Sequence, residues 1–514
     1  MDFPWLTTIG AVPLVGAALV WLLPAARARL LALVFSLATL GGVIAMATQF
    51  DVAKAGAVQF AETYGWIPQI GVSYALGING IGLTMVVLSV FLVPVCVLAA
   101  WREFDAGDEG PLRPGSAKNF FALMLVLETF MVGVFAARDV FLFYVFFEAM
   151  LIPVYFLIGG FGGPQRRYAA VKFLLYSLLG GLIMLVAVIA VYVAGPGGSQ
   201  GFLTDNLIGI HYSSTTVERL LFLGFFFAFA VKAPLWPVHT WLPDAAGEAP
   251  PTVSVLLVGV LDKVGTFGMI TLCLPMFPQA SKWAAPGVVV LALISVLYGA
   301  LLAIGQSNVM RLIAYTSISH FGFIVLGIFA MTSTGQNGST LYMLNHGFST
   351  GALFLIAGFL VARRGSAQIG DYGGLQRATP LLAGVFLVAG LSSLALPGLS
   401  SFVSEILVLI GTFQRYQVAA VVATVGIILA ALYILLTYQR IFTGETKPFS
   451  AGWKDLGGRE AWVVAPLLAV IIALGFYPKP ALDVLSPAVA RTMQQAQVTD
   501  PAPTVPGLAN GAGK

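Results

Sequence analysis

The sequence predicts an all-α, polytopic membrane protein. Hydrophobic residues make up 59% of the 514 residues and charged residues only 9%, whereas a soluble domain carries about 25% charged residues. Apolar segments of about 20 residues recur along the whole chain, and each is long enough to cross a bilayer as a helix. A water-soluble protein is excluded, and the net charge of +4 gives no indication of a nucleic-acid partner.

About fourteen transmembrane spans follow from these segments. Their expected cores are 5–23, 30–49, 79–101, 119–137, 140–160, 168–194, 217–242, 251–274, 284–304, 309–331, 338–362, 379–413, 417–440 and 460–478. The first segment lacks a basic region before it, which favours a retained span over a signal peptide. No amphipathic extension is expected after the last span. The Pro/Ala/Gly-rich tail, 494–514, is expected to be disordered.

The distribution of Lys and Arg predicts the orientation. With the N-terminus outside, fifteen of the 26 basic residues fall in inner connections and eight in outer ones. Because basic residues concentrate on the cytoplasmic side, both termini are expected outside the cytoplasm. The two cysteines, Cys96 and Cys273, lie in apolar segments without the spacing of a zinc or iron-sulfur site. We therefore expect neither a metal nor a cofactor in this chain.

Ionisable residues inside the apolar segments indicate ion or proton translocation. Such groups are costly in hydrocarbon unless they face the bundle interior and have partners, so they usually line a path for ions or protons. They are Glu128, Glu148, Lys172, Lys232, Asp262, Lys263 and Glu405.

Two of the expected spans are interrupted. In the seventh, Pro234 and Pro237 follow Lys232 and remove backbone hydrogen bonds, and His239 lies seven residues after the lysine. In the twelfth, Pro397 precedes Glu405 in a serine-rich stretch. Irregular backbone at membrane depth is tolerated only where it is buried in protein or lines water.

Paired interrupted helices in two halves of a chain are typical of transporters built from structural repeats. Gly181 and Gly351, which are 170 residues apart, fit such a relation. We therefore predict two inverted repeats of five helices within the following organisation: a three-helix segment at 1–118, repeats at 119–274 and 284–442, the last span with its flanks at 443–493, and the tail at 494–514.

Three runs resemble the antiporter-type membrane subunits of respiratory complex I. They are Arg138–Pro153 (RDVFLFYVFFEAMLIP), Val231–Ala245 (VKAPLWPVHTWLPDA) and Leu312–His320 (LIAYTSISH). The resemblance covers nearly the whole chain. The second and third runs are shared with sister subunits and with multisubunit cation/proton antiporters. The first run, together with an acidic residue at Glu405 where the sisters typically carry lysine, favours one branch of the family.

The resemblance implies a proton relay. Glu148 matches the glutamate that modulates the lysine of the broken helix, and Lys232 matches that lysine. Lys263 matches the central relay lysine and Glu405 the terminal carboxylate. Three histidines lie where the polar axis of the family runs: His239, His320 and His346.

The chain departs from the family pattern at three places. Ala246-Gly247 stands where a histidine usually follows Asp244-Ala245. Asn308 and Met310 replace an acidic and a basic residue ahead of Arg311. Asp262 occupies a usually apolar position before Lys263, where it could change the electrostatics of that lysine.

Structural roles remain alternatives for each candidate. Glu148 with Lys232 could be a static ion pair, Asp262 a partner of Lys263, and Glu405 a hydrogen-bond acceptor at the broken helix. Lys172 lies about one turn inside its span and could extend to the surface. Glu128 could be a helix-helix contact, and the histidines could be satisfied interior residues.

The sequence thus predicts a proton-translocating membrane subunit of a bacterial plasma-membrane NADH:quinone oxidoreductase. Its expected partners are membrane lipid, neighbouring antiporter-like subunits and the rest of complex I. FMN, iron-sulfur clusters and quinone are expected in other subunits. The alternatives are a D-type subunit of a multisubunit cation/proton antiporter and a structural scaffold.

Overall fold

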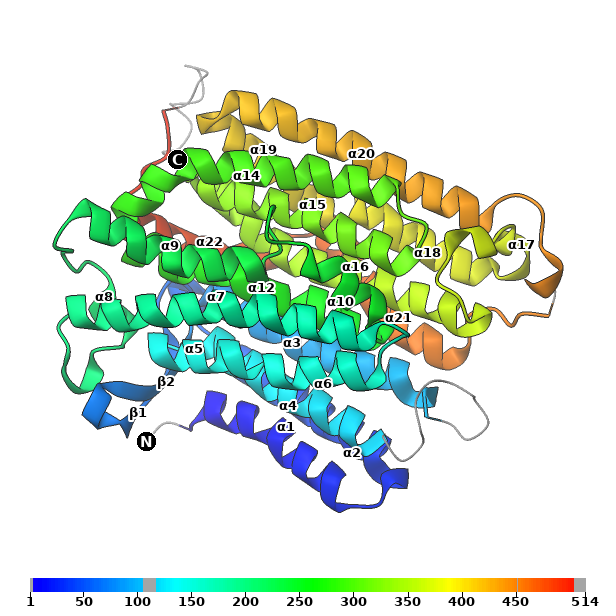
Figure 1. Ribbon diagram of the computed structural model, residues 1–514, viewed down its shortest axis with the longest axis horizontal. Helices are drawn as coiled ribbons and strands as arrows, with labels where there is room; N and C mark the ends of the chain where they lie inside the picture. Colours follow the sequence, from blue (N-terminus) through cyan, green and yellow to red (C-terminus); the bar gives the residue numbers. More distant parts are fainter. Residues whose placement is uncertain (1–2, 105–116, 451, 503–514) are drawn as a thin grey trace.

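The computed structural model describes residues 3–104, 117–450 and 452–502. It is a bundle of roughly parallel and antiparallel helices (Figure 1). Both ends of the described chain lie at the same end of the bundle, here called the terminal end, with the N-terminus beside the strands β1 and β2 (Figure 1). The other end of the bundle is called the opposite end.

The first part of the bundle contains helices α1 to α13. Their bounds are α1 Trp5–Leu22, α2 Ala28–Ala47, α3 Gly80–Ala99, α4 Ala117–Ala136, α5 Val140–Ala149, α6 Leu151–Phe161, α7 Arg166–Ala194, α8 Thr204–Leu207, α9 Thr215–Lys232, α10 Trp241–Glu248, α11 Pro251–Leu256, α12 Asp262–Gly268 and α13 Leu274–Met276. The π-helical turns Leu257–Leu261 and Met269–Cys273 join the last three helices into one rod.

The second part contains helices α14 to α22. Their bounds are α14 Pro278–Ile304, α15 Val309–Phe329, α16 Ser333–Arg364, α17 Leu375–Ala378, α18 Pro380–Ser393, α19 Ser400–Arg415, α20 Gln417–Phe442, α21 Gly458–Phe476 and α22 Lys479–Gln495.

Twelve helical segments of the described chain are long and apolar enough to cross a membrane. The predicted spans 217–242 and 379–413 are not among them, and each is divided into two helices, α9 with α10 and α18 with α19. The 18-residue α9 contains three charged residues, whereas α18 and α19 are each shorter than 18 residues. The helices are therefore interrupted at the places that Pro234, Pro237 and Pro397 predicted. The count of fourteen crossings and the inverted repeat stay predictions.

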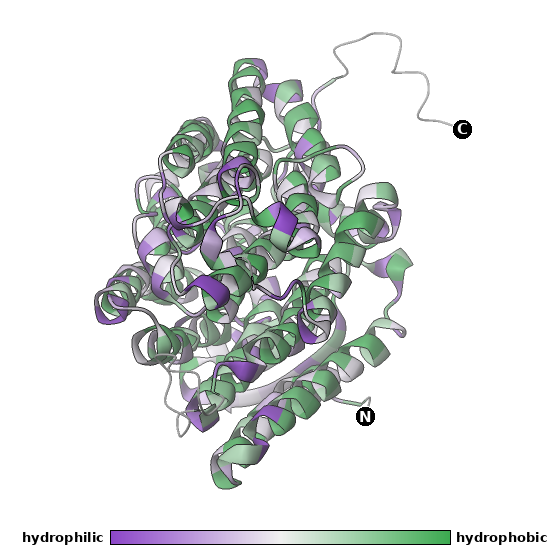
Figure 2. Ribbon diagram, turned by 90° about the vertical axis from the view of Figure 1, so that its right-hand side faces the viewer, coloured by the Kyte–Doolittle hydropathy of each residue, from purple (hydrophilic) through white to green (hydrophobic). Residues whose placement is uncertain are grey.

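Burial separates the interior helices from the peripheral ones. The rod Pro251–Met276 is almost wholly buried, and α15 and α16 nearly so, whereas less than half of α7, α20 and α21 is buried. Apolar ribbon reaches the outside of the bundle (Figure 2). Since lipid tails are as apolar as these side chains, exposed faces of this kind fit a membrane environment.

A β-hairpin, which the all-α prediction did not include, lies at the terminal end. The strands β1 Gln59–Ile67 and β2 Val72–Ile78 pair antiparallel, with Tyr64 opposite Tyr74. The carboxylate of Asp139, which caps α5, accepts the backbone N–H of Ser73 at 2.9 Å. This bond ties the hairpin to the start of α5.

The expectation that no amphipathic extension follows the last span is wrong. The helix α22 follows α21 and packs against α3, α13 and α16. The sequence did not reveal it because Pro480 and Pro487 interrupt its apolar pattern, and Pro480 stands in the first turn, where a missing N–H costs nothing.

Order also continues into the tail predicted to be disordered from 494 onward. The α22 helix reaches Gln495, the carbonyl of Thr499 accepts a bond from Arg415, and the carboxylate of Asp500 accepts the N–H of Ser333. Residues 503–514 lie outside the described part.

Candidate functional site

The first interruption places Lys232 at the end of α9. Pro234 and Pro237 prevent the helix from continuing, and the N–H of Leu235 bonds to the carbonyl of Ala230 instead. The Lys232 side chain is 1% exposed, and its ammonium has no hydrogen-bond partner among the described residues. The nearest ring, that of Phe147, has its centroid 5.0 Å from Nζ. A buried ammonium held only by aromatic faces is available for exchange with a nearby carboxylate.

Glu148 lies against α7 near this lysine. A Cβ at Gly181 would overlap the Glu148 carboxylate, so only glycine leaves room for it there. Glu148 interacts electrostatically with Lys232, but the two form neither a hydrogen bond nor an ion pair. The structure therefore places the predicted pair in the same region without direct contact.

Lys263 lies at the centre of the bundle, and its side-chain nitrogen has two hydrogen-bond partners. It is 0% exposed, and its Nζ donates to the carbonyl of Val258 at 2.6 Å and lies 2.7 Å from Nδ1 of His346. Val258 belongs to the π-helical turn before α12, where backbone bonding departs from the α-helical pattern. Lys263 thus connects the rod of α11 to α13 to the helix α16.

From His346 a row of buried polar groups continues to Glu405. The rings of His346 and His320 are 5.2 Å apart, and Nε2 of His320 lies 3.2 Å from the hydroxyl of Tyr433. The ring of Tyr342 is 5.9 Å from that of His320, and its hydroxyl donates to Oε2 of Glu405 at 2.9 Å. Each group can donate or accept a proton in hydrogen bonding.

A cluster of small polar side chains supports the second interruption. The Asn345 amide donates to the carbonyl of Ser400 at 2.7 Å, and the hydroxyls of Ser349 and Ser392 are 2.7 Å apart. Gly398, at φ +90°, adopts the left-handed conformation that the turn between α18 and α19 needs. These contacts hold α19, and with it Glu405, against α16.

At the opposite end, Asp244 of α10 joins three helices. It pairs with Lys172 of α7 at 2.6 Å and with Arg311 of α15 at 2.5 Å. Lys172 therefore has a partner in the protein. Two of the family departures fit this arrangement: a Cβ at Gly247 would press on the Arg311 side chain, and Asn308 caps the N-terminus of α15.

Two further candidates stand apart from the row. His239 is buried, its ring is 5.2 Å from that of Tyr298, and its Nδ1 has no partner within the described chain. Glu128 of α4 is 0% exposed, and neither of its carboxylate oxygens is bonded to a described residue. The structure does not bring Glu128 into contact with the other candidates.

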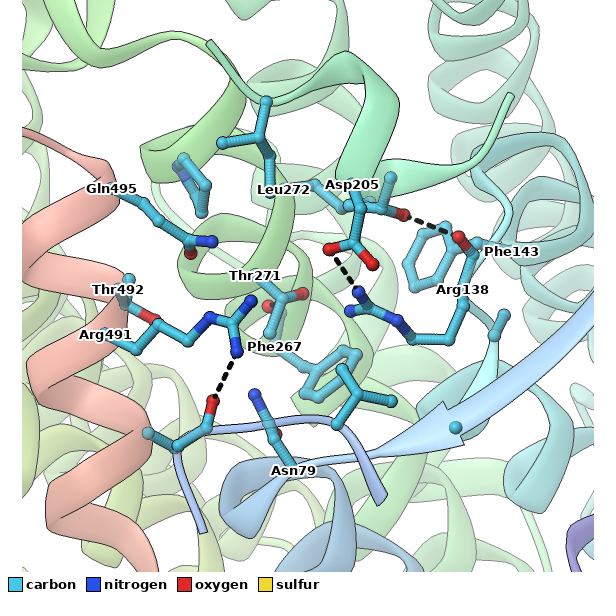
Figure 3. Close-up of a pocket in the computed structure, with 18 of the residues that line it drawn as sticks. Asn79, Arg138, Phe143, Asp205, Phe267, Thr271, Leu272, Arg491, Thr492 and Gln495 are labelled. Carbon is cyan, nitrogen blue, oxygen red and sulfur yellow. Dashed lines mark hydrogen bonds and ion pairs between the residues drawn. The ribbon is translucent and has the colours of Figure 1, made fainter. Parts of the chain in front are cut away.

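A cavity of about 50 Å³ lies at the terminal end, next to β2 and α22 (Figure 3). Arg138 pairs with Asp205 at its rim, and Arg491 donates to the carbonyl of Gly56. Phe267 of α12 forms part of its wall. Since none of the relay candidates lines it, this cavity is separate from the candidate site.

Tyr342, Tyr433 and the pairing of Asp244 with Arg311 were not predicted as site features. One signal in the sequence could have found the tyrosines. The offset of 170 residues that relates Gly181 to Gly351 also relates Lys172 to Tyr342 and Lys263 to Tyr433. Searching for polar residues at this offset from each candidate would have placed both tyrosines on the list.

Comparison with known proteins decides the family. Residues 137–430 match the family described as NADH:quinone oxidoreductase/Mrp antiporter, TM. The chain is 50% identical over 536 aligned residues to NADH-quinone oxidoreductase subunit M from Mycobacterium tuberculosis, covering 98% of this chain and 96% of that protein. The chain belongs to this family. The resemblance inferred from the sequence is confirmed, and the branch that it favoured is that of subunit M, also called chain 4.

Solved structures agree with this assignment. A chain of respiratory complex I from Thermus thermophilus with bound NADH superposes with a TM-score of 0.85 at 31% identity, over 96% of this chain and 99% of that one. A chain of the Mrp complex from Dietzia sp. DQ12-45-1b gives 0.83 at 24% identity, over 96% of this chain and 100% of that one, which shows a shared fold. The protein is therefore an antiporter-like membrane subunit of the complex I type.

Proposed function

We propose that this chain is a proton-translocating subunit of a bacterial plasma-membrane NADH:quinone oxidoreductase. Neighbouring antiporter-like subunits and the rest of the complex are its partners, and FMN, iron-sulfur clusters and quinone belong to other chains. The observation that carries the proposal is the row of buried, mutually close polar groups from Lys263 to Glu405. Membership of the chain in the NADH:quinone oxidoreductase/Mrp antiporter family also supports the proposal.

Protons pass along the second half of the row by short steps. The neutral amine of Lys263 accepts a proton, and the ammonium then gives it to Nδ1 of His346, 2.7 Å away. His320 and the hydroxyls of Tyr342 and Tyr433 lead on to Glu405. Three of these contacts, Lys263 with His346, His320 with Tyr433 and Tyr342 with Glu405, are at the hydrogen-bond distance that proton transfer needs. Between the two histidines, Nε2 of His346 and Nδ1 of His320 have no hydrogen-bond partner among the described residues, so that step needs a ring rotation or a bridging water.

The first half acts as the switch. A carboxylate 4 Å from an ammonium, at an effective dielectric near 20, interacts by about 4 kcal/mol. Moving one proton across the membrane costs about 2.3 kcal/mol per 100 mV. Drawing Glu148 and Lys232 apart therefore changes the proton affinity of Lys232 by enough to drive transfer toward Lys263. Here the two residues interact without direct contact, and their closest approach belongs to another stage of the cycle.

The proposal includes an organisation of the chain as two inverted repeats, 119–274 and 284–442. In both, the interrupted helix pair is the fourth of five spans, α9 with α10 and α18 with α19. The orientation proposed from the basic residues puts the terminal end outside the cytoplasm. The triad of Lys172, Asp244 and Arg311 then lies on the cytoplasmic side.

A second candidate is a subunit of a multisubunit cation/proton antiporter, favoured by the shared fold with a chain of the Mrp complex. Purification in mild detergent distinguishes the two. The proposal predicts that flavin and iron-sulfur subunits accompany the chain. Their absence, together with sodium-dependent proton transport, would favour the antiporter.

The function itself is tested by Lys232→Met in the assembled complex. We expect NADH oxidation by the redox subunits to remain while the protons moved per NADH decrease, because methionine fills the space but carries no proton. Lys447→Met is the control, since Lys447 is a half-buried lysine that donates to the carbonyl of Gly370 outside the spans. Unchanged pumping in Lys232→Met would contradict the proposal. If neutral substitutions of Lys263 and Glu405 also left pumping unchanged, the chain would have a scaffold role instead.

A further inference from the structure

Asp262 is a buried carboxylate on α12, directly before Lys263 and on the helix that packs against α9, which ends at Lys232. It is 0% exposed, and neither carboxylate oxygen accepts a hydrogen bond from a described residue. Both lysines nonetheless interact with it electrostatically. A structural carboxylate at this depth would be expected to accept hydrogen bonds, because a buried, unbonded charge is costly.

The face of α12 that carries Asp262 packs against the end of α9. Gly265 lies one turn after Asp262, and a Cβ there would press on the carbonyl of Phe229 and the N–H of Ala233. A Cβ at Gly268 would meet the Phe229 ring. Two glycines thus allow α12 to approach the interrupted helix, next to Lys232.

Lys263 leaves the same helix in another direction. Consecutive residues point about 100° apart on a helix, and the Lys263 ammonium is bonded to His346 of α16. Asp262 and Lys263 therefore face two different neighbours, α9 and α16. Asp262 therefore faces Lys232, which has no hydrogen bond, while its neighbour Lys263 begins the row of contacts that leads to Glu405.

We propose that Asp262 carries the proton from Lys232 to Lys263, a step that rests on the proposed function. The Asp262 carboxylate takes a proton from the Lys232 ammonium, so that an N–H bond breaks, an O–H bond forms, and an amine and a carboxylic acid result. After Lys263 has passed its own proton to His346, the Asp262 acid gives its proton to the Lys263 amine. The carboxylate and the Lys263 ammonium are restored.

A carboxylate at this place solves an electrostatic problem. While both lysines are protonated, their ammonium groups repel each other, and an intervening carboxylate offsets that repulsion. The negative charge of Asp262 attracts each in turn and is neutralised while it holds the proton. Neither lysine is bonded to Asp262 here, so a side-chain rotation, or one bridging water, completes each contact.

The test compares Asp262→Asn, Asp262→Leu and Asp262→Glu in the assembled complex. Asparagine keeps the shape but holds no exchangeable acid, and leucine supplies the apolar character that is usual at this position. We expect the rate of NADH-driven proton pumping through this subunit to fall at least about 100-fold in both, the lower end of the range for a proton-transfer group. Asp262→Glu is expected to restore most of it.

Thr266→Val is the matched control, because Thr266 is equally buried, lies one turn further along α12 and bonds to Met343 and its own helix. Normal pumping in Asp262→Asn or Asp262→Leu would overturn the proposal. Loss in Asp262→Glu as well, in an intact complex, would assign a structural role and overturn it too. Full pumping in Lys232→Met would instead overturn the proposed function.

Infrared difference spectra during turnover give a readout that a structural role would not affect. The proposal predicts a transient carboxylic-acid C=O band that is absent in Asp262→Asn and shifted in Asp262→Glu. The same spectrum in wild type and Asp262→Asn would contradict it, whatever the effect of the substitution on assembly.

Discussion

The two halves of the buried row differ in how their charged groups are held. Around α9, the Lys232 ammonium and the Oε1 atom of Glu148 make no hydrogen bond to the described residues. From Lys263 onward, three contacts at hydrogen-bond distance, Lys263 with His346, His320 with Tyr433 and Tyr342 with Glu405, are joined by packed rings. Within this second half, only Nε2 of His346 and Nδ1 of His320 among the ring nitrogens lack a hydrogen-bond partner in the described chain. Bonded groups hold their geometry, whereas unbonded buried charges depend on their separation. The comparison suggests a switch in the first half and a fixed conductor in the second.

The largest effect is expected for Lys263→Met, because it removes the residue at which the two halves meet. The variant loses the contacts to Val258 and His346. The number of protons moved per NADH should fall by the whole share of this subunit. Proton uptake by membrane vesicles during NADH oxidation measures it, and a normal ratio would show that the halves do not meet at Lys263.

The next largest effect is expected for the tyrosines in the row of polar groups from Lys263 to Glu405. Tyr342→Phe removes the donor to Glu405, and because a hydrogen bond to a charged group contributes about 1.5 kcal/mol or more, the pumping rate should fall about tenfold. Tyr433→Phe, whose hydroxyl lies 3.2 Å from His320, should have a smaller effect.

The double variant of Tyr342 and Tyr433 sharpens this prediction. If both tyrosines lie on one path, their effects on the pumping rate will not add in a double-mutant cycle. Tyr212→Phe is the control, since its hydroxyl bonds to Met276 away from the row. Additive effects would indicate that the two hydroxyls act on separate paths.

A moderate effect on stability is expected at the opposite end. Asp244→Asn leaves Lys172 and Arg311 without their counter-charge. Because the side chains are partly exposed, we expect a loss of about 1 to 2 kcal/mol. Release of the subunit from the heated complex, followed on native gels, measures it.

The pH dependence of this loss has a definite sign. Asp244 lies after the predicted core of the seventh span, which ends at residue 242, and it pairs with Lys172 and Arg311 at the opposite end of the bundle. Burial raises its pKa, but the bonds from Lys172 and Arg311 outweigh burial and hold the pKa below its ordinary value. The carboxylate therefore stabilises the fold above about pH 4, the range of an unfolded Asp. The difference between wild type and Asp244→Asn should shrink as the pH falls below that value, and a constant difference would contradict this.

The smallest effect is expected for Glu128→Gln. Glu128 is buried without a hydrogen bond to the described residues and apart from both halves of the row. We expect pumping to change less than about twofold, since no proton-transfer partner lies within reach. A loss as large as that of Tyr342→Phe would require a path through α4.

The sequence predicted the membrane character, the interrupted helices and the charged candidates, because these depend on hydropathy and on proline chemistry. It did not predict α22 or the hairpin, whose apolar patterns are short or interrupted. Nor did it predict which candidates meet. Asp262 and Lys263 are neighbours in sequence, yet their directions differ, and the contact of Lys263 with His346 depends on tertiary packing.

Tyrosines illustrate the remaining gap. Tyr342 and Tyr433 are marked in the sequence only by their offset of 170 residues from Lys172 and Lys263, and the positions of Glu405 and His320 beside them show what their hydroxyls contact. Gly181 is similar, because its importance comes from the carboxylate of Glu148 that it accommodates. Contacts between distant segments, rather than local pattern, carry this information.

The most direct test of the central claim is the number of protons pumped per NADH by the complex carrying Lys232→Arg. Arginine keeps the positive charge but does not release its proton in proteins, so it preserves a static ion pair and removes exchange. The account predicts a ratio lowered as far as in Lys232→Met. A ratio equal to that of the wild type would show that the charge alone suffices and would contradict the relay.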